Sequence, residues 1–201
     1  MIRGKFITFE GGEGSGKTTQ SKLLYDYLIS HNIDAVWTRE IGGTPGAEKI
    51  RQVVIDHDLD EESELLMIIA ARMDHVRKLI EPSVIHGKWV ICDRFSDSTL
   101  AYQGCSINIE KIISLNNLFL GDFHPDLTFF IDVPPEVGVE RAIDRGNNNK
   151  FEAKTLAFHN QVYRNFKSLG NRFGDRIVSI NGAQTLAHVH SDILNVIKER
   201  F

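Results

Sequence analysis

Gly11-Gly12-Glu13-Gly14-Ser15-Gly16-Lys17-Thr18 is the segment from which the fold of this chain can be inferred. It satisfies the pattern G-x-x-x-x-G-K-[S/T], in which glycines let the backbone wrap around phosphate oxygens and point its N–H groups inward. The apolar run at 5–10 before it is typical of a strand, and the segment 17–30 after it is typical of a helix. Because that helix presents its positive end to an anion, the order strand, loop, helix predicts a nucleotide-binding loop.

Two side chains of the loop carry the chemistry that its spacing predicts. Lys17 can reach the β- and γ-phosphates of a nucleotide, and the Thr18 hydroxyl can bind Mg²⁺. We expect phosphate contacts along the loop and the first helical turn, which comprise Gly11, Gly12, Glu13, Gly14, Ser15, Gly16, Lys17, Thr18 and Thr19. The loop indicates which group is bound, but it leaves the reaction open because many families share it.

Two carboxylates end strand-like runs in the neighbourhood of this loop. Glu10 ends the first run, and Asp93 follows the apolar run Trp89-Val90-Ile91-Cys92. Parallel sheets bind ligands at the carboxyl ends of their strands, so either side chain could hold Mg²⁺ or its water shell. Polar residues also commonly end strands without any such role, and the sequence does not choose between these readings.

Strand-like and helix-like segments alternate outward from the loop. We expect strands at 5–10, 35–38, 89–92, 127–133 and 176–180. We expect helices at about 17–30, 46–56, 61–86, 97–104, 109–120, 136–145, 152–173 and 184–199. This alternation predicts an α/β fold with a mostly parallel sheet between helix layers, and 201 residues suit a single domain over 1–201.

The composition narrows the class of protein. The formal net charge of −4 argues against broad, sequence-blind binding of nucleic acid. The longest apolar run, at 65–71, is far shorter than the roughly 20 residues of a membrane span, so we expect no membrane partner. Two cysteines, Cys92 and Cys105, are too few for a disulfide framework, and we expect a cytoplasmic protein.

Three arginines occupy positions that point to a second anion site. Arg72 lies on the apolar stripe of its predicted helix, so it either pairs with an internal acid or points into a ligand cavity. Arg39 and Arg94 end strand-like runs, where each alone is most often a surface residue. Together, planar guanidinium groups at a sheet edge favour bidentate binding of a second phosphate.

A further pair of cations precedes an unusual segment. Arg141 and Arg145 are one helical turn apart and are followed by Asn147-Asn148-Asn149 and Lys150. They could form a solvated helix end, where cations complement the helix dipole. They could equally belong to a mobile lid, at about 141–152, that brings charge onto a transferred phosphoryl group.

Taken together, these residues resemble the thymidylate kinases, particularly the bacterial ones. The resemblance covers essentially the whole chain and is far more specific than the loop alone. It is carried by Phe9-Glu10-Gly11, Thr38-Arg39-Glu40 with Gly42-Gly43-Thr44-Pro45, Leu65-Leu66-Met67 with Ala70-Ala71-Arg72, Asp93-Arg94-Phe95, Ser98-Thr99 with Ala101-Tyr102-Gln103-Gly104, and Asp132-Val133-Pro134-Pro135-Glu136.

The resemblance implies transfer of a phosphoryl group from ATP to thymidine monophosphate (dTMP), with Mg²⁺, in a homodimer. It also implies the nucleoside-monophosphate-kinase fold, with a five-stranded parallel sheet and a short lid. The residues that it implies for the acceptor are Arg39 and Arg94 for the phosphate, Arg72 for a thymine carbonyl, Thr99 and Gln103 against the base, Tyr102 under the deoxyribose, and Glu10 beside them. Catalytic cations would be Lys17, Arg94 and, from the lid, Arg141 and Arg145.

The chain departs from the family pattern at three positions. Ile68 stands where an aromatic ring usually stacks on thymine, Ile41 replaces a proline, and Lys150 stands where an arginine is common. A kinase for another nucleoside monophosphate or for a deoxynucleoside is the nearest alternative. A nucleotide-operated switch is a more distant one, because the guanine-reading motif N-K-x-D is not matched by Asn149-Lys150-Phe151-Glu152.

Overall fold

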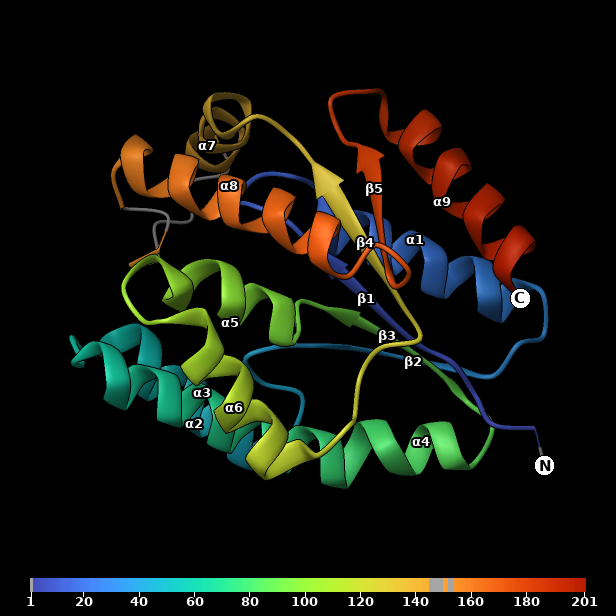
Figure 1. The fold of residues 1–201 in the computed structure, drawn as a ribbon. Coiled ribbons are helices and arrows are strands. Elements are labelled where there is room, and N and C mark those ends of the chain that lie inside the picture. The colour runs from blue at the N-terminus through green and yellow to red at the C-terminus, as the bar shows by residue number, and fades with distance from the viewer. Residues whose placement is uncertain (1, 145–149, 152–153) are drawn as a thin grey trace.

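A computed structural model describes residues 2–144, 150–151 and 154–201 (Figure 1). The strands are β1 (Phe6–Glu10), β2 (Ala35–Arg39), β3 (Trp89–Asp93), β4 (Leu127–Asp132) and β5 (Ile177–Asn181). The α-helices are α1 (Lys17–Ser30), α2 (Pro45–Asp56), α3 (Glu61–His75), α4 (Glu81–Ile85), α5 (Ser96–Tyr102), α6 (Ile109–Leu120), α7 (Pro135–Asp144), α8 (Leu156–Arg172) and α9 (Leu186–Arg200).

The five strands form one parallel sheet in the order β2-β3-β1-β4-β5. The central strand β1 therefore has β3 on one side and β4 on the other. Phe9 pairs with Asp93, and Asp93 pairs with Arg39 on β2, so the carboxyl ends of these strands meet at one edge. This confirms the five-stranded parallel sheet between helix layers that the sequence predicts.

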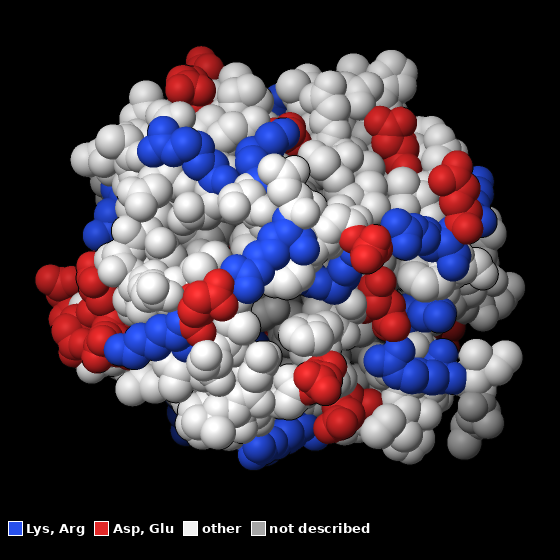
Figure 2. Space-filling model, in the orientation of Figure 1, with Lys and Arg blue, Asp and Glu red and all other residues white. Residues whose placement is uncertain are grey.

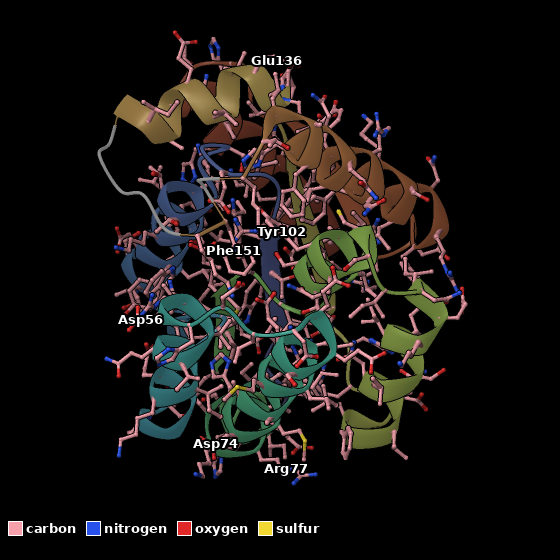
Figure 3. The ribbon with its side chains drawn as sticks, turned by 90° about the vertical axis from the view of Figure 1, so that its left-hand side faces the viewer. Asp56, Asp74, Arg77, Tyr102, Glu136 and Phe151 are labelled. Atoms are coloured by element: carbon pink, nitrogen blue, oxygen red, sulfur yellow. The ribbon has the colours of Figure 1, made fainter. Side chains whose placement is uncertain are left out.

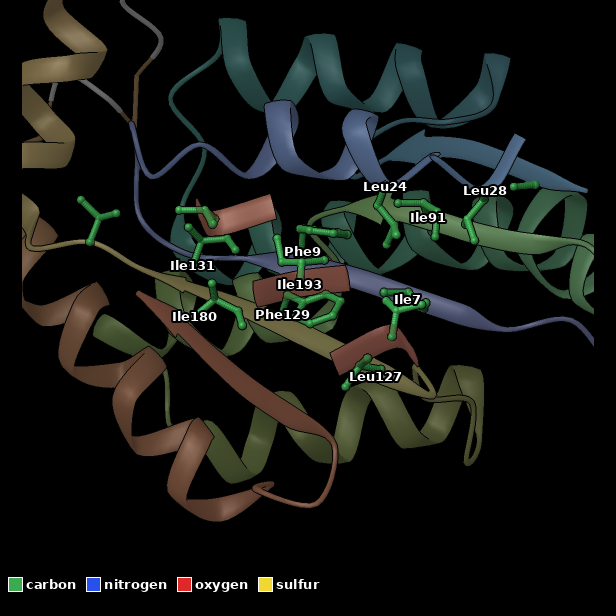
Figure 4. Close-up of a cluster of buried hydrophobic side chains, with 14 residues drawn as sticks. Ile7, Phe9, Leu24, Leu28, Ile91, Leu127, Phe129, Ile131, Ile180 and Ile193 are labelled. Atoms are coloured by element: carbon green, nitrogen blue, oxygen red, sulfur yellow. The ribbon is translucent and has the colours of Figure 1, made fainter. Parts of the chain in front are cut away.

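Both faces of the sheet are covered by helices (Figure 1). On one face, Ile7 and Phe9 of β1 pack with Leu24 of α1 and Ile193 of α9 (Figure 4). On the other face, side chains of α3, α5, α6 and α8 form a second cluster against the sheet. Because β1 is buried along its whole length, its position under the glycine-rich loop is fixed from both sides.

The largest difference from the sequence prediction lies in the segment 61–86. A single helix was expected, but α3 is followed by a π-helical turn at Val76–Ile80 and then by the short helix α4. The wider turn precedes Pro82, which has no N–H to donate to the preceding turn and whose ring crowds the carbonyl four residues back.

The predicted helices at 17–30 and 109–120 match α1 and α6, and the other boundaries differ by at most four residues. Helix α8 begins at Leu156 rather than at 152, because the Thr155 side chain accepts the N–H of Phe158 and so caps the helix there. The predicted loop at 147–149 and part of the predicted lid lie outside the described residues. That 1–201 is a single domain stays a prediction.

The surface carries charges of both signs. On the face seen in Figure 2, Lys and Arg side chains are interspersed with Asp and Glu, and acidic side chains gather at the left edge. None of the helices in the described ranges combines the length and the apolar character that crossing a bilayer requires.

Candidate active site

A cavity of about 550 Å³ opens at the carboxyl edge of the sheet. The glycine-rich loop contributes Glu13, Gly14, Gly16, Lys17, Thr18 and Thr19 to its lining. The acceptor residues predicted from the sequence also line it, namely Arg39, Ile68, Arg72, Arg94, Thr99, Tyr102 and Gln103. The two predicted anion sites are therefore two parts of one cavity.

The loop is held in shape by close backbone contacts. Gly14 has φ +67°, and a Cβ on it would lie 1.8 Å from the carbonyl oxygen of Gly138 on α7, so only glycine fits. Lys17 folds back over the loop, where its Nζ donates to the Gly12 carbonyl at 2.6 Å and to Ser15 Oγ at 3.2 Å. Burial lowers the pKa of Lys17 to about 8, against the opposing effect of Glu13 and Asp93.

The structure separates the two candidate metal-binding carboxylates. Thr18 Oγ1 donates to Asp93 Oδ2, and the buried Asp93 Oδ1 has no hydrogen-bond partner in the described part of the chain. Glu10 is not among the lining residues. Its Oε1 accepts the N–H of Phe95 at 2.7 Å, and Ser98 donates to its other oxygen. Asp93 is thus the carboxylate with an oxygen available beside Thr18, whereas Glu10 anchors the start of α5.

The charge state of Glu10 follows from the same burial. Loss of solvent, together with repulsion from Asp97, raises the pKa of Glu10 to about 8. Asp97 is itself held by two hydrogen bonds from Arg176, at 2.6 and 2.8 Å. The segment that carries Arg94, Ser98 and Tyr102 is therefore tied to the sheet through polar groups beneath it.

Arg94 links the acceptor side of the cavity to the glycine-rich loop. Arg94 comes directly after β3, and its φ of +71° is uncommon for a residue with a side chain. The guanidinium donates to Glu13 Oε1 at 2.7 Å and to the Gly11 carbonyl at 3.0 Å. Tyr102 also donates to Glu13 Oε1, at 2.8 Å. Although burial opposes it, the charges of Arg94 and Lys17 lower the pKa of Glu13 to about 2.

Arg72 satisfies both readings that the sequence left open. It is only 2% exposed, and its Nε donates to Glu40 Oε2 at 2.7 Å, so it is paired with an internal acid. The same guanidinium lines the cavity, so it is also in reach of a ligand. His75 holds the other oxygen of Glu40 at 3.2 Å, and burial of Glu40 is more than offset by Arg72 and His75, which lower its pKa.

The remaining predicted acceptor residues take up positions around these arginines. Arg39 donates to Glu48 at 2.9 Å while lining the cavity, and Gln103 donates to Glu64 at 2.9 Å. Ile68 lies one turn before Arg72 on the same face of α3. The contacts expected between these side chains and a nucleotide stay predictions.

Comparisons with known proteins agree with this geometry. The family model for thymidylate kinase matches residues 9–193. The thymidylate kinase of Orientia tsutsugamushi (strain Ikeda) is 48% identical over 206 residues, which cover 98% of this chain and 94% of that protein. The thymidylate kinase of Rickettsia africae (strain ESF-5) is 46% identical over 185 residues, or 91% of each chain.

This chain belongs to the thymidylate kinase family. The crystal structure of thymidylate kinase from Ehrlichia chaffeensis matches it with a TM-score of 0.80 and 38% identity, covering 97% of this chain and 99% of that one. The nucleoside-monophosphate-kinase fold expected from the sequence is thereby confirmed. The alternative of a kinase for another substrate is not favoured, because these relatives are all thymidylate kinases.

The cations predicted for the lid are not brought to the cavity by the described residues. Arg141 donates to the Gly182 carbonyl at 3.3 Å and is not among the residues that line the cavity, and Arg145 lies outside the described residues. Lys150 forms an ion pair with Glu64 on α3. The catalytic roles predicted for Arg141 and Arg145 stay predictions.

Sequence reasoning gave no site role to seven of the lining residues, which are Glu40, Ile41, Arg51, Ile55, Phe95, Ser98 and Phe151. The Phe151 ring lies edge-on to Tyr102, with 5.9 Å between the ring centroids (Figure 3). The sequence feature that could have indicated Phe151 is its place directly after Lys150, in the segment predicted as a lid. Arg51 donates to the Ile41 carbonyl at 2.9 Å, and it had no distinguishing pattern in its helix.

Proposed function

We propose that this protein transfers the γ-phosphoryl group of ATP to dTMP and releases ADP and thymidine diphosphate. The observation that carries the proposal is the single cavity that brings Lys17 together with Arg39, Arg72 and Arg94. One part of this cavity is built from backbone amides for a polyphosphate, and the other offers guanidinium groups for a nucleoside monophosphate. A phosphoryl transfer between two nucleotides needs these two parts side by side.

The acceptor needs little chemical activation in such a reaction. The second pKa of a phosphate monoester is near 6, so at neutral pH the acceptor oxygen is mostly deprotonated. The task left to the protein is to hold two negatively charged groups in line and to neutralise them. Arg94 is suited to this task because it contacts both the loop carbonyl of Gly11 and the acceptor side of the cavity.

Mg²⁺ fits the residues at the loop. The Thr18 hydroxyl and the unpartnered Asp93 Oδ1 are oxygen donors, which Mg²⁺ prefers, and phosphate oxygens and water would complete its shell. When bound there, the ion would offset the charge of the β- and γ-phosphates. We propose Thr18 and Asp93 as its protein contacts, with Glu10 positioning α5 rather than binding the metal.

We further propose a cytoplasmic homodimer. Helices α3 and α6 carry exposed apolar side chains, including Leu66 at 50% and Leu118 at 73% exposure, and a second copy could cover them. Sedimentation of the purified protein tests the dimer, and a monomer at micromolar concentration would contradict it.

A coupled assay of ADP release with each common nucleoside monophosphate tests the function. We expect the highest kcat/KM with dTMP, weaker activity with deoxyuridine monophosphate, and loss of activity when Mg²⁺ is chelated. The weaker activity is expected because one methyl group discriminates by only about 1–3 kcal/mol. A preference for a purine monophosphate would contradict the proposal.

A further inference from the structure

The guanidinium of Arg72 is held by acceptors from several different parts of the chain. Nε donates to Glu40 at 2.7 Å, and Nη2 donates to Thr99 Oγ1 at 2.7 Å and to the Phe95 carbonyl at 3.3 Å. Nη1 donates to Asn116 Oδ1 at 3.0 Å. A guanidinium has five N–H donors, so one hydrogen on Nη1 has no acceptor in the ranges that the structure describes. Because Arg72 lines the cavity, that N–H is the donor left for a ligand.

Asn116 is an unusual residue for its position on α6. The buried side of this helix consists of Ile112 and, one turn later, Asn116. An amide at such a position costs free energy unless it is hydrogen-bonded, whereas leucine would pack there without that cost. Arg72 is the partner that satisfies it. Since a guanidinium only donates, the atom of Asn116 that faces it must be the carbonyl oxygen.

Asn116 does not line the cavity, so it can affect a ligand only through Arg72. We propose that Asn116 is a positioning residue that makes the enzyme selective for a pyrimidine with a carbonyl at position 4. This inference rests on the proposed function, in which Arg72 reads the base. No feature of the sequence pattern marked Asn116, since it lies 44 residues from Arg72.

The selectivity for thymine over cytosine depends on the Nη1 hydrogen that Asn116 leaves free for the base. A guanidinium is planar and holds its five N–H groups in a fixed fork, so the bonds to Glu40, Thr99 and Asn116 together fix the direction of the second Nη1 hydrogen. That hydrogen suits a base that presents an oxygen there. Thymine and uracil present a carbonyl at position 4, whereas cytosine presents an amino group that cannot accept this bond. Without Asn116, both hydrogens of Nη1 would lack an acceptor in the described ranges, and only the bonds on Nε and Nη2 would hold the guanidinium plane, so Nη1 could shift away from its place beside the cavity.

The test compares deoxycytidine monophosphate with dTMP in variants of the full chain. In Asn116→Leu, which keeps the branching at Cγ and removes the acceptor, we expect KM for dTMP to rise about tenfold. We expect kcat and the KM for ATP to change less than about twofold, so the selectivity ratio of the two kcat/KM values falls about tenfold. Asn116→Asp retains an oxygen at the same place and is expected to restore the ratio.

Asn117 offers a matched control, because it is the next residue on α6 and is exposed. Asn117→Leu is expected to leave the selectivity ratio unchanged. A folded Asn116→Leu with the wild-type ratio would overturn the inference, as would an equal loss in Asn117→Leu. If Asn116→Leu does not fold, Asn116→Ser replaces it, because the shorter hydroxyl side chain does not reach Nη1, and the same outcomes apply.

The same assay separates this inference from the proposed function. A wild-type protein that phosphorylates no dTMP would overturn both. A wild-type protein that phosphorylates dTMP, with Asn116 variants that keep its selectivity, would overturn the inference alone.

Discussion

The two parts of the cavity hold their cations in different ways. At the phosphate-binding loop, Lys17 is held by the Gly12 carbonyl and by Ser15, both within the same short stretch of chain. At the acceptor part, three arginines come from β2, α3 and the end of β3. Each is paired with its own carboxylate, in the pairs Arg39–Glu48, Arg72–Glu40 and Arg94–Glu13.

In the part of the chain that the structure describes, the loop therefore has an unpaired positive charge ready for a ligand, whereas the acceptor part has guanidinium groups whose positions are fixed by paired carboxylates. Within the described ranges, the loop offers backbone N–H groups and a cation with no carboxylate hydrogen-bonded to it, so it is already complementary to a polyanion. The acceptor part is nearly neutral by pairs, and its carboxylates fix where the guanidinium groups stand. An acceptor phosphate must therefore share Arg39 and Arg94 with the glutamates that position them.

The largest effect is expected at the loop. Lys17→Ala removes the cation beside the β- and γ-phosphates, and turnover is expected to fall on the order of a thousandfold while the fold is kept. Steady-state kinetics with circular dichroism measures both. Lys22→Ala, on the exposed side of α1, is the control. Wild-type turnover in a folded Lys17→Ala would show that the loop is not the donor site.

A smaller and more selective effect is expected at the acceptor part. Arg94→Ala is expected to lower kcat/KM for dTMP about a hundredfold, because it removes a cation and leaves Glu13 unpaired. Separate titrations of ATP and dTMP should show that dTMP binding suffers far more than ATP binding. Equal losses for both ligands would break the distinction between the two parts, since Arg94 also contacts the loop carbonyl of Gly11.

The smallest expected effect is a gain in affinity for dTMP. Ile68 lines the cavity without an aromatic ring, so Ile68→Phe is expected to tighten dTMP binding about fivefold by stacking on the base. Glu61→Phe introduces the same ring at an exposed position of α3 and is expected to leave dTMP binding unchanged. Calorimetric titration with dTMP measures both variants. Unchanged or weaker binding in Ile68→Phe would mean that residue 68 does not face the base.

The same contrast explains how much could be predicted from the sequence. The loop is contiguous, and its glycines and lysine have fixed spacing, so its strand, helix and cation were all predicted. Arg72 was also found, because a cation on an apolar stripe requires an explanation. The identity of its carboxylate, Glu40, and of its amide partner, Asn116, depends on how α3 and α6 pack, and neither has a local signal.

The sequence also could not distinguish Glu10 from Asp93, although the two residues lie near each other at the sheet edge. Both end strands at one edge of the sheet, and their sequence contexts do not differ in a way that assigns the metal. The roles that we propose for them differ because of the groups that surround them in space, since Phe95 and Ser98 donate to Glu10 whereas Thr18 donates to Asp93. Arg141, for which the sequence left a solvated helix end and a lid open, donates to the Gly182 carbonyl in the turn after β5.

The close contact between Gly14 and Gly138 places a constraint on a residue that is remote from any phosphate. A Cβ at Gly138 would lie 2.4 Å from the Glu13 carbonyl oxygen, just as one at Gly14 would strike Gly138. Even an alanine at position 138 would push α7 away from the backbone of the glycine-rich loop. Residue 138 must therefore stay a glycine if the glycine-rich loop is to keep its shape, although it lies on a different helix from that loop.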